Sequence, residues 1–245
     1  MEVIMLEAFG RTWLTSHGLG ARGQADVAVP LVYGGAGEQR SAEAMLRMVD
    51  GYTARAARRI AAGETMACNV DRVRFRAATD AEREALSAEL VAQEAHDPLV
   101  HGDDAWIDGM QALSRIDDAM RAVLERHEVT GGKFTNRCLS AIVCKQFESF
   151  PGRIQMFRDP PRNDHESGWA FICNDQAHNH DDVDNLMLVH VGDVVRMRRV
   201  VLPYLILPAG AAVTFDLADD LAAVFAPGED DAVVKRIVVP EPAPR

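Results

Sequence analysis

The sequence predicts an α+β protein in which a helix-rich first part is followed by a mainly antiparallel sheet with flanking helices. Two observations carry this prediction. Before about residue 130, apolar residues recur at helical spacing over long stretches. After it, short apolar segments follow one another with turn residues between them. Short strands in succession favour antiparallel pairing, with helices segregated to one side of the sheet.

Three helices and two strands are predicted in the first part. The earlier strand covers residues 27–33, and Pro30 favours an edge position for it because proline has no backbone N–H. Ser41 can cap a helix over residues 41–62, and a strand is predicted over 68–76 because polar and apolar residues alternate there. A capping-box pattern at Thr79 opens a second helix over residues 79–95. A third helix is predicted over residues 105–128, where apolar side chains share one stripe.

The second part is predicted to contain a series of strands. Gly131-Gly132 breaks the helical pattern and is the predicted boundary between a domain over residues 1–130 and another over 131–239. Residues 240–245 are predicted to be a flexible tail. The predicted strands cover residues 138–144, 153–158, 168–173, 186–191 and 232–239, and a further helix is predicted over 217–225.

Composition and charge narrow the possible partners. The 245 residues are 48% hydrophobic with a net charge of −11, which argues against nucleic-acid binding and is compatible with a basic protein partner. No stretch has the length of a membrane helix, and the first residues lack the basic segment of a signal peptide, so we expect a cytoplasmic protein. The four cysteines form no Cys-x-x-Cys pair and are predicted to be reduced, buried thiols rather than a disulfide or zinc site: Cys68, Cys138, Cys144 and Cys173.

A polar segment rich in Asp and His interrupts the apolar strands, and residues 175–185 are called the acidic insert below. It contains Asp175, Asp181, Asp182, Asp184 and Asn185, with His178 and His180 among them. Two histidines two residues apart face the same way on an extended chain, so His178, His180 and Asp182 are candidate metal ligands. A solvated acidic loop is the preferred interpretation, because no characteristic zinc-ligand spacing is present and no cofactor is predicted.

Three short motifs in this part resemble those of a known family. Ser167-Gly168-Trp169 is followed by the Asp184-Asn185 pair and then by Pro203-Tyr204-Leu205. In this order and spacing, residues 138–216 resemble the Imm33 immunity-protein family, also known as the DUF2185 domain. No family is recognised for residues 1–130.

The resemblance implies a non-enzymatic bacterial protein that neutralises a toxin in the cytoplasm. An acidic loop on a rigid sheet suits a basic cleft, because complementary charge speeds encounter and sets orientation. The predicted binding residues are Asp175, Asp181, Asp182, Asp184, Asn185 and Tyr204, while Trp169 is expected in the core. The alternative is a metal-dependent hydrolase that uses His178, His180 and Asp182.

Overall fold

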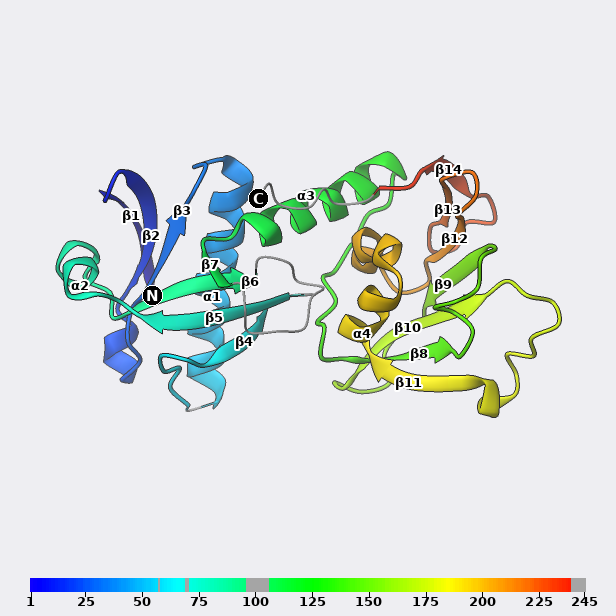
Figure 1. Ribbon diagram of the computed structural model, residues 1–245, viewed down its shortest axis with the longest axis horizontal. Coiled ribbons are helices and arrows are strands. Elements are labelled where there is room, and N and C mark those ends of the chain that lie inside the picture. Colours follow the sequence, from blue (N-terminus) through cyan, green and yellow to red (C-terminus); the bar gives the residue numbers. More distant parts are fainter. Residues whose placement is uncertain (57, 69–70, 96–105, 239–245) are drawn as a thin grey trace. The chain divides into compact units, whose positions relative to one another are not determined.

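The computed structural model describes residues 1–56, 58–68, 71–95 and 106–238, and it has the mixed α+β architecture that was predicted (Figure 1). The chain divides into two compact units, the first formed by Met1–Asp117 and the second by Asp118–Pro240. Among the described residues, no helix combines the length and apolar character needed to cross a membrane.

The first unit is built on a seven-stranded sheet with the order β1-β2-β3-β6-β5-β4, in which β7 also pairs with β6. β3 and β6 are parallel, and the other described pairs of this sheet are antiparallel. The strands are β1 (Glu2–Ala8), β2 (Arg11–His17), β3 (Val27–Leu31), β4 (Thr65–Cys68), β5 (Asp71–Ala77), β6 (Leu90–Ala95) and β7 (Trp106–Asp108). The helices are η1 (Leu19–Arg22), α1 (Ala36–Ala56), α2 (Asp80–Leu86) and the start of α3 (Gln111–Arg126).

The prediction of a helix-rich first part is wrong, because strands begin the chain and also follow α2. The predicted helix over 79–95 starts with the expected capping box but ends at Leu86, where Ser87 adopts a left-handed conformation with φ 51°. The chain then turns back as β6, whose residues are mostly buried between β3 and β5. A short apolar run fits a buried strand as well as a helix, so periodicity could not decide this segment.

The predicted first and third helices are present with shifted ends. The first is α1, and the third is α3, which starts after β7. The buried carboxylate of Glu94 on β6 accepts hydrogen bonds from the backbone N–H groups of Ala112 (2.9 Å) and Leu113 (3.0 Å). Those N–H groups have no partner within the helix, so a strand residue determines where α3 begins.

One ion-pair cluster in the first unit is expected to make its stability depend on pH in the acidic range. Arg76 donates two 2.8 Å hydrogen bonds to Glu82 and also contacts Asp108. The bonds from Arg76 lower the pKa of Glu82 from 4.5 to about 2. Because this carboxylate has a lower pKa when folded, it stabilises the protein above pH 4.5, and that contribution is lost as the pH falls toward 2.

We therefore expect Glu82→Gln to remove about 2 kcal/mol from the free energy of unfolding at neutral pH. The variant should also show a weaker loss of stability between pH 4.5 and pH 2 than the unmodified protein. Urea titrations across this range measure both effects. Glu84→Gln, an exposed change on the same helix, is the matched control. Identical pH profiles for Glu82→Gln and the unmodified protein would contradict the assignment.

The second unit contains a seven-stranded sheet with the order β11-β8-β10-β9-β12-β13-β14. β8 and β10 are parallel and the other described pairs are antiparallel, so the sheet is mainly antiparallel as predicted. The strands are β8 (Ser140–Cys144), β9 (Ile154–Arg158), β10 (Glu166–Cys173), β11 (Leu186–His190), β12 (Ala212–Asp216), β13 (Leu221–Phe225) and β14 (Val233–Arg236). The helices are the end of α3, η2 (Val183–Asn185), α4 (Val191–Met197) and η3 (Arg199–Ile206).

The predicted helix over 217–225 is wrong, because this segment forms a tight turn and then β13, which pairs with β12. The carboxylate of Asp216 accepts hydrogen bonds from the backbone N–H groups of Ala218 and Asp219, and Asp220 has φ 56°. An aspartate that bonds the backbone just ahead of it favours a turn over a helix.

The predicted domain boundary was placed at Gly131-Gly132. The two compact units of the structure divide earlier, between Asp117 and Asp118 within α3. That residues 131–239 fold on their own stays a prediction, and the predicted tail over 240–245 lies outside the described residues.

Candidate functional site

The acidic insert connects β10 to β11 and is shaped by its own polar side chains. Side-chain oxygens of Asp175, Asn179 and Asp182 each accept a hydrogen bond from the backbone N–H two residues later, at 2.9, 3.0 and 3.0 Å. Such bonds stabilise consecutive turns. The acidic insert therefore has a defined backbone, and it leaves Asp181, Asp182 and Asp184 exposed.

Asn185 fixes the end of the acidic insert rather than presenting a free amide. Its side chain donates to the Asn179 carbonyl at 2.8 Å, and its own carbonyl accepts from the Lys145 backbone N–H at 3.0 Å. The Asp184-Asn185 motif thus closes the loop and ties it to the end of β8.

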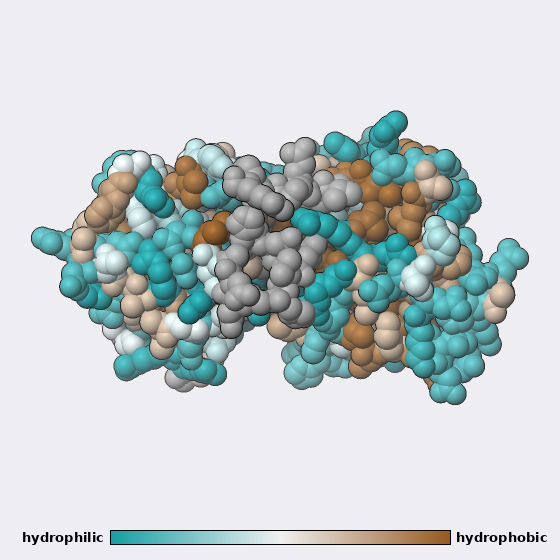
Figure 2. Space-filling view, in the orientation of Figure 1, coloured by the Kyte–Doolittle hydropathy of each residue, from teal (hydrophilic) through white to brown (hydrophobic). Residues whose placement is uncertain are grey.

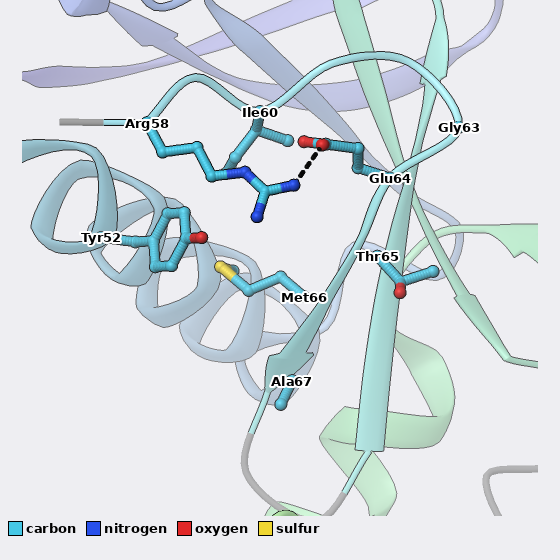
Figure 3. A pocket seen from close by; sticks show the side chains of 8 residues that line it. All are labelled: Tyr52, Arg58, Ile60, Gly63, Glu64, Thr65, Met66 and Ala67. Atoms are coloured by element: carbon cyan, nitrogen blue, oxygen red, sulfur yellow. Dashed lines mark hydrogen bonds and ion pairs between the residues drawn. The ribbon is translucent and has the colours of Figure 1, made fainter. Parts of the chain in front are cut away.

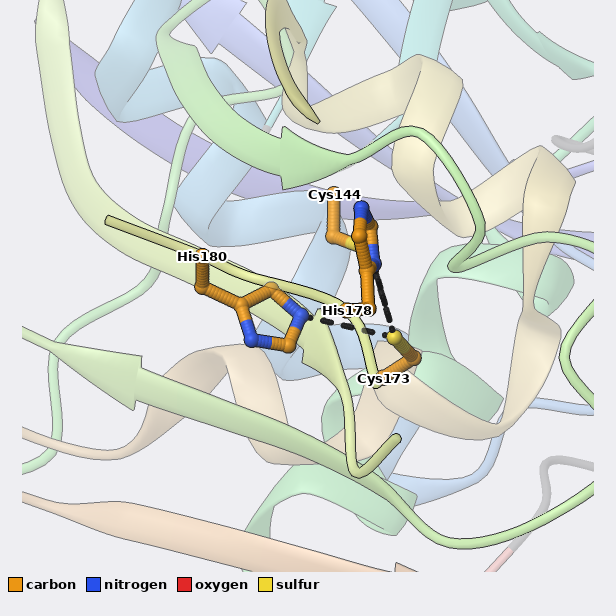
Figure 4. A group of neighbouring side chains, drawn as sticks. All are labelled: Cys144, Cys173, His178 and His180. Atoms are coloured by element: carbon orange, nitrogen blue, oxygen red, sulfur yellow. Dashed lines mark hydrogen bonds between the residues drawn. The ribbon is translucent and has the colours of Figure 1, made fainter. Parts of the chain in front are cut away.

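Four potential metal ligands converge beside the acidic insert: Cys144, Cys173, His178 and His180 (Figure 4). Cys144 is the last residue of β8 and Cys173 the last residue of β10. Because these neighbouring strands are parallel, their carboxyl ends lie at the same edge of the sheet. The chain leaving β10 then brings His178 and His180 over the two sulfurs, and all four ligand atoms lie within 4.8 Å of one another.

Individual distances within this group, called the Cys2His2 cluster below, are short. The two sulfurs are 3.5 Å apart, and Nδ1 of His178 lies 3.1 Å from the Cys144 sulfur and 3.2 Å from the Cys173 sulfur. Nε2 of His180 is 3.4 Å from the Cys173 sulfur. A disulfide bond is only about 2.05 Å long, and the cysteines of this chain are free.

Burial favours the neutral forms of two members of the cluster, Cys173 and His180, in the absence of a cation. It raises the pKa of the Cys173 thiol. It also lowers the pKa of His180, and the neighbouring His178 acts in the same direction. Neutral imidazoles are the form that binds metals.

The Cys2His2 cluster differs from the predicted metal set. The two histidines do meet, but Asp182 is not in the group, since its carboxylate accepts from the Asp184 N–H. The sequence interpretation also treated the cysteines as inert core thiols. Cys68, Cys144 and Cys173 are buried as predicted, whereas Cys138 is exposed. One feature of the sequence could have indicated the cluster, since two of the predicted strands end in cysteine, at Cys144 and Cys173.

The sheet of the second unit has an apolar face that is exposed to solvent. Pairing aligns Leu188, Ile142, Ala170 and Phe157 in one row across β11, β8, β10 and β9. Leu188 is 70% exposed, Ile142 45% and Phe157 36%, whereas Ala170 is only 6% exposed. We call the row of Leu188, Ile142, Ala170 and Phe157 the open face. Figure 2, which does not mark this row, shows brown apolar surface among teal hydrophilic side chains on the visible side of the unit.

A hollow of about 460 Å³ lies over the open face. Its rim carries the acids Asp159, Glu166 and Asp181 together with the cation Arg162, and His180 lines it beside them. The open face and the acidic insert therefore form one continuous surface with an apolar floor and an acidic edge. Sequence reasoning missed this surface, because a continuous apolar run such as Ser140–Cys144 usually indicates burial on both faces.

The first unit has a hollow of about 440 Å³ between the end of α1 and β4 (Figure 3). Tyr52, Arg58, Glu64 and Met66 are among the residues that line it. Arg58 is paired with Glu64 at 2.9 Å, so its charge is already balanced. Arg58 is therefore not available as an unpaired positive charge for an acidic ligand in this hollow.

Two motifs of the resemblance build the core of the second unit. Ser167 donates to the Ser140 carbonyl at 2.7 Å and accepts from the Trp169 backbone N–H, which joins β10 to β8. Trp169 is buried as expected. Tyr204 is also fully buried, and its hydroxyl accepts from the Val238 backbone N–H at 3.3 Å. Tyr204 therefore has no exposed surface for the binding role predicted for it.

A comparison with known protein families found a match for one segment of the chain. Residues 119–226 match the model of the Imm33-like domain. This confirms the resemblance over the segment that carries the motifs. The Imm33-like domain includes β8 to β13, the acidic insert, the Cys2His2 cluster and the open face. Neither curated proteins nor solved structures yielded a match to the chain.

Proposed function

We propose that this chain is an immunity-type protein whose Imm33-like domain binds and neutralises a basic protein toxin. The observation that carries the proposal is the exposed apolar row with an acidic edge, within a domain that matches an immunity-type family. Exposed apolar surface rimmed by polar residues is typical of protein-binding sites.

Two parts of this surface have different roles in the proposal. The open face provides Leu188, Ile142 and Phe157, which can bury against an apolar side chain of the partner and supply most of the affinity. The acidic insert provides Asp181, Asp182 and Asp184, which attract a cationic surface and orient it. Asp175 and Asn185 shape the loop that presents these charges.

Charge reversal in the acidic insert tests this proposal. We expect Asp181→Lys, Asp182→Lys and Asp184→Lys together to weaken binding of the toxin encoded beside the gene by 10-fold or more, about 1.4 kcal/mol or more. The melting temperature should change little, because exposed charges contribute about 0 to 1 kcal/mol each. Binding by purified proteins at several salt concentrations and growth protection in cells that express the toxin are the measurements.

The turn between β13 and β14 offers a matched control, since Glu229, Asp230 and Asp231 are also exposed and consecutive. Their reversal to Lys changes the net charge equally but should leave binding and protection intact. A second pair separates the apolar contribution: Leu188→Asp on the open face should abolish binding, and Val234→Asp, which is 54% exposed on β14, should not. Equal binding by the reversed insert and its control would contradict the proposed surface.

A further inference from the structure

We propose that Cys144, Cys173, His178 and His180 form a structural zinc site that fastens the acidic insert to the edge of the sheet. The inference rests on the convergence of two strand ends and one loop, which brings Cys144 next to Cys173, His178 and His180 although it is 29 residues from the nearest of them. Figure 4 shows the four side chains pointing toward one another.

The distances agree with a tetrahedral zinc site. Zinc binds cysteine sulfur at about 2.3 Å and histidine nitrogen at about 2.0 to 2.1 Å, so neighbouring ligand atoms lie about 3.6 to 3.8 Å apart when sulfur is involved. Four of the six separations, at 3.1 to 3.5 Å, are a few tenths of an ångström shorter, and the other two, from His180 to Cys144 and to His178, are at most 4.8 Å. A cation between these atoms therefore needs the close atoms to move slightly apart and His180 to adjust its position.

The ligand types select the metal and its role. Two thiolates with two imidazoles are typical of zinc, whereas calcium and magnesium require oxygen ligands. Four protein ligands complete a tetrahedron and leave no position for water, which distinguishes a structural site from a catalytic one. On binding, Cys144 and Cys173 each release a proton, so two thiolates balance the double charge of the ion.

The position of the site gives it a consequence for the acidic insert. His178 and His180 lie within this insert, and Asp181 and Asp182 follow His180 directly. A zinc ion would tie the middle of the loop to the ends of β8 and β10. The loop would then hold its exposed carboxylates in one arrangement before a partner arrives. This last step rests on the proposed function, whereas the zinc site itself does not.

The test measures metal in the full-length protein purified without a histidine tag. We expect one zinc per chain by elemental analysis, and cobalt substitution should give the visible bands of tetrahedral cobalt with a thiolate charge-transfer band. Cys173→Ser and His178→Ala should each lose the metal. Cys138→Ser and His165→Ala, which alter exposed residues outside the cluster, should retain it.

A second measurement avoids variants that fail to fold. Removal of the metal from the unmodified protein by a strong chelator should speed amide hydrogen exchange in residues 174–185, with little change in the strands of the first unit. Zinc far below one per chain together with no cobalt–thiolate band would overturn the proposal, as would full zinc retention by Cys173→Ser. A Cys144–Cys173 disulfide in the purified protein would also overturn it. Because none of these measurements involves a partner protein, a negative result would not contradict the toxin-binding proposal, which is tested separately.

Discussion

Replacement of Trp169 by alanine is expected to lower the free energy of unfolding by about 3 to 5 kcal/mol, the range for truncating a buried aromatic side chain. Trp169 is 1% exposed, and its indole N–H donates to the Thr135 hydroxyl at 3.1 Å. Its ring also lies 5.4 Å from the guanidinium of the buried Arg158. Truncation would remove this packing and leave a cavity. Denaturant unfolding followed by circular dichroism measures the loss.

Trp169→Phe is the matched control, because it keeps an aromatic ring and removes only the hydrogen bond and part of the volume. We expect it to cost clearly less than the alanine variant. If Trp169→Ala left stability unchanged but abolished partner binding, the residue would be an interface anchor and the assignment to the core would be wrong.

Replacement of Gly168 by alanine is expected to cost about 3 kcal/mol or more, since it combines backbone strain with a direct clash. Gly168 has φ +78°, and an added Cβ would lie 2.0 Å from the Asp159 carbonyl oxygen. That oxygen belongs to the backbone and can move only with the chain. Denaturant unfolding of the variant measures the cost.

Gly228 provides a control with almost the same backbone angle, because its φ is +79° and an added Cβ meets nothing within 4 Å. Gly228→Ala should therefore report the conformational cost alone, about 1 to 2 kcal/mol. Equal losses for the two variants would show that the contact with Asp159 has no energetic weight.

Both expectations explain why Ser167-Gly168-Trp169 can characterise the domain through its structural role. Ser167 joins β10 to β8, Gly168 permits the close approach of Asp159, and Trp169 fills the core. The β8–β10 pair is also the one that brings Cys144 next to Cys173. The motif therefore builds the support for the candidate site, whereas the exposed acids and the open face are the proposed contact surface.

The sequence was most informative where short apolar runs end at turn residues. The strands of the second unit near residues 140, 154, 166 and 186 were predicted close to their observed positions. The segments at 87–95 and 217–225 were misassigned as helix. In both, a turn formed by a residue with positive φ, Ser87 or Asp220, redirects the chain into a strand. Such a turn depends on backbone dihedral angles, and hydrophobic periodicity contains no information about them.

By itself, the sequence determined the α+β class, the acidic insert, the core role of Trp169 and the resemblance of the second part to an immunity family. These follow from local patterns, since periodicity and turn residues act over neighbouring positions. Only the tertiary structure decided which strands are neighbours. The parallel pairing of β8 with β10 places Cys144 close to Cys173 and to the two histidines. The order of the strands in the sheet places the apolar residues of the open face in one row. Contacts between residues so distant in the chain depend on how whole elements pack, and no local pattern specifies them.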